Sequence, residues 1–183
     1  MALQVKRVGF GQVEPNHLSA QTNGQIYAQL PADANLTILE NGMFLKYDYA
    51  NGKCDLTGDG EWLLVMNEIK LYDERKQGLK DYAMQAADFM GGTIVPRLLR
   101  TEIGDIYTTN TFGANTSDSA TVNGLNLAVG NKLTVDSSTG YLKVAGNNDT
   151  EFIWQVVKEY TMPDGQPGVK IQRIAWGRRI KWL

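Results

Sequence analysis

The chain has 183 residues, of which 43% are hydrophobic and 21% are charged, a composition typical of ordinary globular proteins. Its net charge of −2 argues against electrostatic binding to nucleic acid or to an anionic membrane. No stretch approaches the ~18 apolar residues of a membrane-spanning helix, and a single cysteine, Cys54, excludes an internal disulfide and a cysteine-based zinc site.

The first residues carry neither an export signal nor a recognisable active site. The segment 1–20 lacks the run of about seven apolar residues that a signal peptide needs, so we expect synthesis and assembly in a reducing cytoplasm. His17 is the only histidine and follows Pro15 in a loop-like stretch. Without a G-x-S-x-G or H-E-x-x-H motif beside it, we expect no catalytic residue and no enzyme.

Seven short runs rich in β-branched and aromatic residues predict strands, and pairs of Asn or Asp with Gly mark the turns between them. The runs are residues 24–30, 36–49, 61–72, 92–99, 104–112, 125–146 and 151–176. The turn pairs are Asn23-Gly24, Asn41-Gly42, Asn51-Gly52, Asp59-Gly60, Asn123-Gly124 and Asp164-Gly165. The sequence therefore predicts a mainly β protein with antiparallel sheets arranged as a sandwich or barrel.

The stretch NGKCDLTGDGEW, residues 51–62, resembles a calcium loop at first sight because Asp55, Asp59 and Glu61 lie close together. An EF-hand loop that begins at Asp55 requires a bidentate glutamate at its twelfth position, where this chain has Met66. The flanking residues also predict strands rather than helices. We therefore expect a solvated hairpin connection with Asp59-Gly60 at its tip, and no metal or other cofactor.

One segment has a helical pattern. Within residues 73–90, Leu79, Tyr82, Ala83, Ala86 and Met90 follow the i, i+3, i+4, i+7 spacing of an amphipathic helix. An aspartate at the first position is a suitable N-cap, and two glycines after the last position are a suitable stop. The sequence predicts one short α-helix here.

A polar stretch of small residues, 113–124, divides the chain. It predicts an exposed loop or linker between a β-rich part, residues 1–112, and a part rich in β-hairpins, residues 125–183. Two arrangements fit this pattern. Either the parts form two lobes, or both pack into one β domain with a long surface loop.

The C-terminal stretch KIQRIAWGRRIKWL alternates basic and large apolar residues. Trp and Arg are the residue types most enriched at interface hot spots, because they combine large buried area with directional hydrogen bonds. A final strand packed in the protein's own core is one interpretation, and an intermolecular anchor is another. Nucleic-acid binding is a third, although neither the rest of the chain nor its net charge is basic. The candidate interface residues are Trp176, Arg178, Arg179, Lys181 and Trp182.

Three stretches, residues 67–84, 91–112 and 154–174, resemble the small head auxiliary proteins, or capsid decoration proteins, of tailed bacteriophages. The resemblance covers about half of the chain and supplies no residue-level motif. It implies a β-rich, non-enzymatic protein that binds the outer face of the capsid. Its partners would be the major capsid protein and copies of itself, with no nucleic acid and no membrane.

Two other functions remain open from the sequence. The chain is alternatively a structural component of the phage tail or neck, such as a tail-tube or head-completion protein. From a different class, it is a carbohydrate-binding β module, which would need exposed aromatic side chains along a shallow groove.

Overall fold

The computed structural model describes residues 3–5, 7–8, 11–36, 38–67, 83–85, 95–113, 121–122, 125–147, 149 and 151–174. All the strands that pair within this part of the chain are antiparallel. Each of the seven predicted runs contains at least one strand. The prediction of a mainly β protein with antiparallel sheets and one short helix is confirmed, although the described helix lies outside the segment predicted to be helical.

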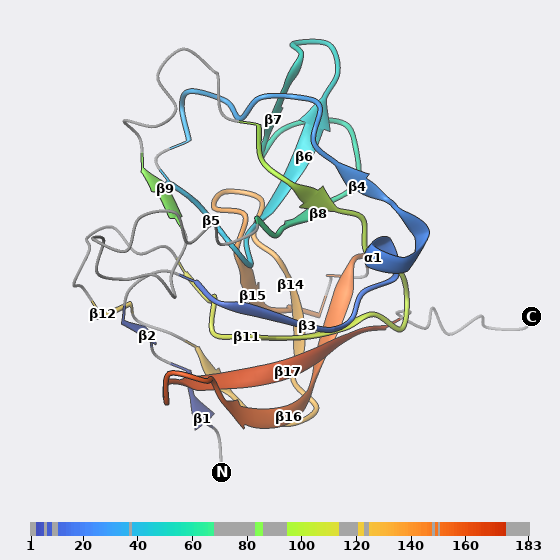
Figure 1. Cartoon of the computed structure of the whole chain (residues 1–183). Coiled ribbons are helices and arrows are strands. Elements are labelled where there is room, and N and C mark those ends of the chain that lie inside the picture. Colours follow the sequence, from blue (N-terminus) through green and yellow to red (C-terminus); the bar gives the residue numbers. More distant parts are fainter. Residues whose placement is uncertain are drawn as a thin grey trace, which may run out of the picture.

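Two larger sheets form most of the fold (Figure 1). The first has the order β4 (Ile26–Tyr27), β10 (Leu98–Leu99), β8 (Leu63–Val65), β6 (Phe44–Asp48) and β7 (Lys53–Asp55). The second has the order β15 (Leu142–Val144), β14 (Lys132–Val135), β16 (Ile153–Thr161), β17 (Pro167–Ile174), β11 (Ile106–Thr109) and β3 (Val13–His17). In Figure 1, β6, β7 and β8 lie at the opposite end of the molecule from β16 and β17.

Three two-stranded sheets complete the described fold. They pair β1 (Leu3–Gln4) with β13 (Asn126–Leu127), β2 (Arg7–Val8) with β12 (Thr121–Val122), and β5 (Ile38–Glu40) with β9 (Ala83–Gln85). Strands from both sides of the predicted linker meet in the six-stranded sheet, because β3 and β11 precede this segment and β14 to β17 follow it.

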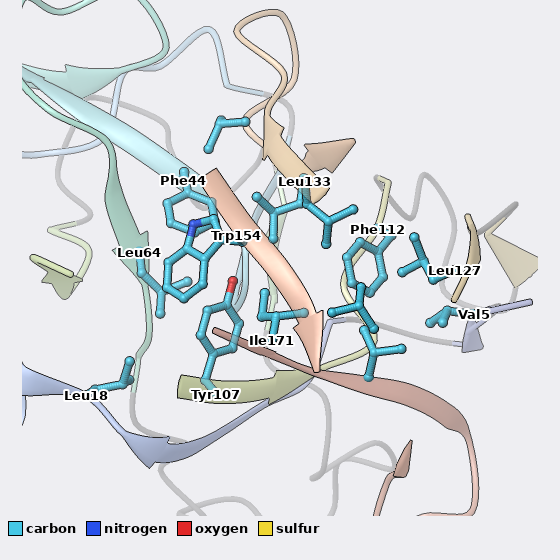
Figure 2. Close-up of a cluster of buried hydrophobic side chains, with 14 of the residues drawn as sticks. Val5, Leu18, Phe44, Leu64, Tyr107, Phe112, Leu127, Leu133, Trp154 and Ile171 are labelled. Atoms are coloured by element: carbon cyan, nitrogen blue, oxygen red, sulfur yellow. The ribbon is translucent and has the colours of Figure 1, made fainter. Parts of the chain in front are cut away.

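The first hydrophobic core lies between the two larger sheets (Figure 2). Phe44 and Leu64 contribute from the five-stranded sheet, and Tyr107, Trp154 and Ile171 from the six-stranded sheet. Trp154 is fully buried, and its ring meets that of Tyr107 edge to face, with 5.0 Å between the ring centroids. Aromatic pairs in this geometry add to the free energy gained by burying their surface.

The five-stranded sheet is buried on both faces. Because side chains alternate along a strand, Leu64 points to the first core while its neighbours Leu63 and Val65 point to a second one. Leu45 and Leu98 join the second core from adjacent strands. This arrangement explains why residues 63–65 form an uninterrupted apolar run rather than an alternating one.

Residues 132–144, within the predicted run 125–146, form a hairpin. Strands β14 and β15 pair with Leu133 opposite Val144 and with Val135 opposite Leu142. Leu133, Val135 and Leu142 are buried as the alternation predicts, whereas Val144 is 48% exposed because it lies at the end of the outermost strand.

The Asn-Gly and Asp-Gly pairs have more than one structural role. Asn51-Gly52 connects β6 to β7, and Asp164-Gly165 connects β16 to β17, so both lie in hairpins as predicted. Asn23-Gly24 instead ends a helix, with Gly24 as its left-handed C-cap at a φ of 68°. Gly fits both roles because it adopts positive φ without steric cost.

Two further pairs do not close hairpins. Asn41-Gly42 joins β5 to β6, which belong to different sheets. Asp59-Gly60 joins β7 to β8, which flank β6 on opposite sides, so the connection crosses the end of β6. The hairpin predicted with Asp59-Gly60 at its tip is therefore wrong. Asn123-Gly124 lies outside the described residues.

The helix predicted over residues 73–90 is wrong in the part that the structure describes. Within residues 73–90 the structure describes only Ala83–Gln85, and these form strand β9, with Met84 opposite Leu39. The other residues of the predicted helix lie outside the described part. The described helix is α1 (Ser19–Asn23), whose first backbone N–H donates to the buried carboxylate of Asp105. No helix among the described residues has the length and apolar character needed to cross a membrane.

The predicted exposed segment 113–124 is described only at its ends. Gly113 is partly buried, and its carbonyl oxygen accepts a hydrogen bond of 2.5 Å from Arg7. Thr121 and Val122 form strand β12, so this end of the segment is a strand rather than a loop.

Candidate functional site

The interface candidates of the C-terminal stretch lie outside the described residues. They are Trp176, Arg178, Arg179, Lys181 and Trp182, whereas the structure describes the chain only to Ile174 at the end of β17. The intermolecular anchor therefore stays a prediction.

The acidic residues of the stretch 51–62 serve separate purposes. The carboxylate of Asp55 accepts hydrogen bonds from the backbone N–H groups of Thr57 and Gly58, both at 2.8 Å, and from the Thr57 hydroxyl at 3.0 Å. Glu61 forms an ion pair of 2.6 Å with Arg100. Asp55 thus stabilises a local turn in the way that aspartate commonly does. No group of three His, Cys, Asp or Glu side chains suited to a metal ion occurs in the described ranges.

His17 and Cys54, the two residues with potential nucleophilic chemistry, lie on edge strands of two different sheets. His17 is exposed at the end of β3, an edge strand of the six-stranded sheet. Cys54 is fully buried on β7 in the other large sheet, and its thiol lies 3.3 Å from the carbonyl oxygen of Pro31. This separation gives no Cys-His pair of the kind that nucleophilic catalysis uses.

The Cys54 thiol is expected to be unreactive in the folded protein. Burial, as the main cause, raises its pKa to about 12. The thiolate, which is the reactive species, is then on the order of one part in 10,000 at pH 8. Labelling with Ellman's reagent at pH 8 should therefore be negligible in native buffer and complete after denaturation, where the pKa returns to its ordinary range. Because the chain has no other cysteine, complete native labelling would contradict the burial of Cys54.

A buried ion pair that the sequence analysis did not anticipate fixes β2 to the fold. Arg7 is 1% exposed and Glu40 is 0% exposed, and both guanidinium Nη atoms donate to the carboxylate, at 3.0 and 2.6 Å. The same carboxylate accepts from the Tyr141 hydroxyl at 2.6 Å and from the backbone N–H of Gly11 at 2.7 Å. Burial, and then the charge of Glu40, raise the pKa of Tyr141 strongly, so it stays protonated as a donor.

A groove of about 500 Å³ opens on the surface between the two larger sheets. Its lining comes from β6, the connection before β8, β14, the segment before β16, and β17. The lining residues are Lys46, Gly60, Glu61, Trp62, Thr134, Asp149, Glu151, Phe152 and Arg173. This volume lies within the range of about 300–1,000 Å³ that is typical of small-molecule sites.

Two cations of the groove lie over aromatic rings. The Lys46 ammonium is 4.7 Å from the centre of the Trp62 ring. The guanidinium carbon of Arg173 is 4.2 Å from the centre of the Phe152 ring, and its Nη1 also donates to the backbone oxygen and the hydroxyl of Thr101. Burial lowers the pKa of Arg173, while nearby carboxylates act in the opposite direction, so it stays charged at neutral pH.

The groove could not be found from the sequence. Its lining residues come from five separate segments, and no spacing rule links them. The only local signal is Trp62, an aromatic residue placed directly after Glu61 and a glycine-rich turn. What the groove offers chemically is a mixture of two cations, three carboxylates and two aromatic rings, which suits binding through hydrogen bonds and apolar contact.

Comparison with protein-family models, with curated proteins and with solved structures finds nothing that matches this chain.

Proposed function

We propose that this chain is a non-enzymatic structural protein of a bacteriophage virion, which decorates the outer capsid surface after assembly in the host cytoplasm. It binds the major capsid protein and neighbouring copies of itself. Three stretches that resemble head auxiliary proteins support this proposal, as does the mainly β fold that such proteins have. The single observation that carries it is the edge strand β15, which pairs with no described strand other than β14.

The described sheet edges differ in whether another strand can pair with them. The edge at β7 is covered by the segment that precedes β5, since Asp33 and Pro31 exchange backbone hydrogen bonds with Cys54. The edge at β3 carries Pro15, which has no N–H to donate, and its register against β11 shifts at a bulge. The edge at β4 is only two residues long.

Strand β15 contains no proline, and no described segment pairs with its outer edge. Asp136 N donates to Tyr141 O, and Ala145 N donates to Lys132 O, so residues 141, 143 and 145 direct their backbone groups toward β14. By the alternation of an antiparallel pair, the backbone groups of Leu142 and Val144 face away from β14, and of these two residues only Val144 is exposed. Val144 is also 48% exposed and lies on the same strand face as the buried Leu142.

This edge suggests how the protein would hold a capsid lattice. A strand of the capsid protein, or of a second copy, would pair with the outward backbone groups of Val144, and an apolar side chain of that strand would cover the Val144 side chain. Each such contact is small. Repetition over many lattice sites would make the total stabilisation of the head large.

Val144→Pro should reduce capsid binding by at least about tenfold, the equivalent of ~1.4 kcal/mol. The substitution removes an N–H that points away from β14, so the β14–β15 ladder stays intact. Co-sedimentation with particles assembled from a major capsid protein measures the occupancy.

Val129→Pro is the matched control. Val129 is also an exposed valine, at 61%, and it precedes Gly130 in a turn closed by the Asn131 N to Ala128 O hydrogen bond. Proline is favoured at this turn position, so the control should fold and bind as the unaltered protein does. Equal binding by both variants would refute the role of β15. Rings or tubes formed by the isolated protein would favour the tail or neck alternative instead.

A deletion of residues 176–183 tests the second predicted contact. If the C-terminal stretch is an intermolecular anchor, the shortened protein should stay folded and lose occupancy on the same particles. Full binding by the folded, shortened protein would remove the anchor from the proposal, while the role of β15 would be unaffected.

A further inference from the structure

The groove between the two larger sheets has the features of a built ligand site. Phe152, on its wall, has a φ of 53°, and no other non-glycine residue among those described has a positive φ. A bulky residue in this conformation costs about 1–3 kcal/mol, and it persists only when its surroundings fix it. Such strain is commonly found at binding sites, so it independently indicates that the groove is one.

The surroundings of Phe152 explain how this conformation is held. Its ring meets Phe44 edge to face, with 5.4 Å between the centroids, and it also contacts Trp154 of the first core. Arg173 covers its other side from β17. With its backbone in the left-handed conformation, Phe152 packs its ring against the first core and also lines the groove.

The polar groups of the groove are also held in place before any ligand binds. Thr101 accepts from Nη1 of Arg173, while Nη2 and Nε have no hydrogen-bond partner among the described residues. The carboxylate of Asp149 accepts from the backbone N–H of Gly146 at 2.7 Å. A site with fixed donors and acceptors loses little entropy when it binds a ligand.

The mixture of charges limits the class of ligand. An anionic ligand would be repelled by the carboxylates of Glu61, Asp149 and Glu151. A cationic ligand would be repelled by Lys46 and Arg173. Neither sign of ligand charge is favoured throughout the groove. A neutral ligand with many hydroxyl groups suits both kinds of side chain, because each hydroxyl donates to carboxylates and accepts from cations.

The aromatic rings fit the same class. Trp62 is partly buried against the first core, and Lys46 lies over its ring. Its accessible part provides an apolar surface beside the carboxylates, of the kind that the C–H groups of a sugar ring contact. A purely polar groove would lack this contact.

We propose that the groove binds a neutral saccharide. Glu61 and Glu151 accept hydrogen bonds from sugar hydroxyls, Arg173 donates to them through its unused N–H groups, and Trp62 contacts the apolar face of a sugar ring. This second activity does not depend on capsid binding. It would give the protein a means of contacting glycans in addition to any contact made by β15.

The test uses the purified full-length chain on an array of neutral, acidic and basic oligosaccharides that includes chitotetraose and maltoheptaose. Neutral glycans should bind with a Kd below about 1 mM by calorimetry, in the weak range expected of a shallow site. Glu151→Gln removes one exposed acceptor charge and should weaken binding at least about fivefold. Trp62→Ala should weaken it at least about tenfold, if circular dichroism shows that the variant folds.

Glu159→Gln is the matched control, because Glu159 is exposed on β16 and does not line the groove. It should bind saccharide as the unaltered protein does. The proposal is overturned if no neutral glycan on the array binds, if charged glycans bind more tightly, or if Glu151→Gln binds unchanged. Val144→Pro should keep full saccharide binding, which separates this result from the outcome for capsid binding.

Discussion

Glu40→Ala should lower the free energy of unfolding by about 3–5 kcal/mol, one of the two largest effects of a single substitution that we expect. The change leaves the guanidinium of Arg7 buried without its carboxylate, and it removes the acceptor for Tyr141 and for the Gly11 N–H. For a chain of this size the midpoint of thermal unfolding should fall by about 6–20 °C. Calorimetry or circular dichroism measures this shift.

A control variant tests whether the lower stability of Glu40→Ala comes from the unpaired charge of Arg7 or from the lost volume of the Glu40 side chain. Replacing the whole network with apolar residues, as Arg7→Met, Glu40→Leu and Tyr141→Phe together, should restore most of the stability. If Glu40→Ala loses less than about 1 kcal/mol, the ion pair does not hold β2 to the fold as we infer.

Trp154→Ala should have the second large effect, lowering the free energy of unfolding by about 3–5 kcal/mol. The side chain is fully buried between the two larger sheets, where it contacts Phe44, Tyr107 and Phe152. Removing it leaves a cavity that neighbours on two different sheets cannot fill by small shifts. Because Phe152 also lines the groove, saccharide binding should weaken in the same variant. Urea denaturation and calorimetric titration measure the two effects.

Trp154→Phe separates packing from hydrogen bonding. The indole Nε1 is buried and has no hydrogen-bond partner among the described residues, so no hydrogen bond within this part of the chain is lost. Trp154→Phe should therefore lower the free energy of unfolding clearly less than Trp154→Ala does. An equal loss for both variants would indicate that Nε1 makes an essential contact.

The sequence determined those parts of the structure that depend on local chemistry. Alternating residues and a short turn are sufficient for the β14–β15 hairpin, and Asn51-Gly52 and Asp164-Gly165 join neighbouring strands as predicted. The prediction that residues 55–66 do not form an EF-hand loop also depends on position alone, since Met66 occupies the place of a required glutamate. Each of these features depends on residues that are close together in the chain.

Local patterns failed where pairing with a distant strand decided the outcome. Residues 83–85 carry part of a helical spacing, yet they pair with β5, where the opposing Leu39 is fully buried. Asn23-Gly24 ends a helix because Asp105, more than eighty residues away, holds the first turn of α1. Tertiary contacts outweigh helix propensities, which amount to less than about 1 kcal/mol for most residues.

Both the ion pair and the groove were decided only by the tertiary structure. Arg7 and Glu40 are 33 residues apart, and the groove gathers side chains from five segments of two sheets. Composition and spacing report which side chains are present and which strand face they share. They do not report which faces meet, because that depends on how the sheets pack. For this reason the sequence determined a β-rich chain with defined turns, whereas packing alone placed Phe152, Arg173 and Trp62 around one groove.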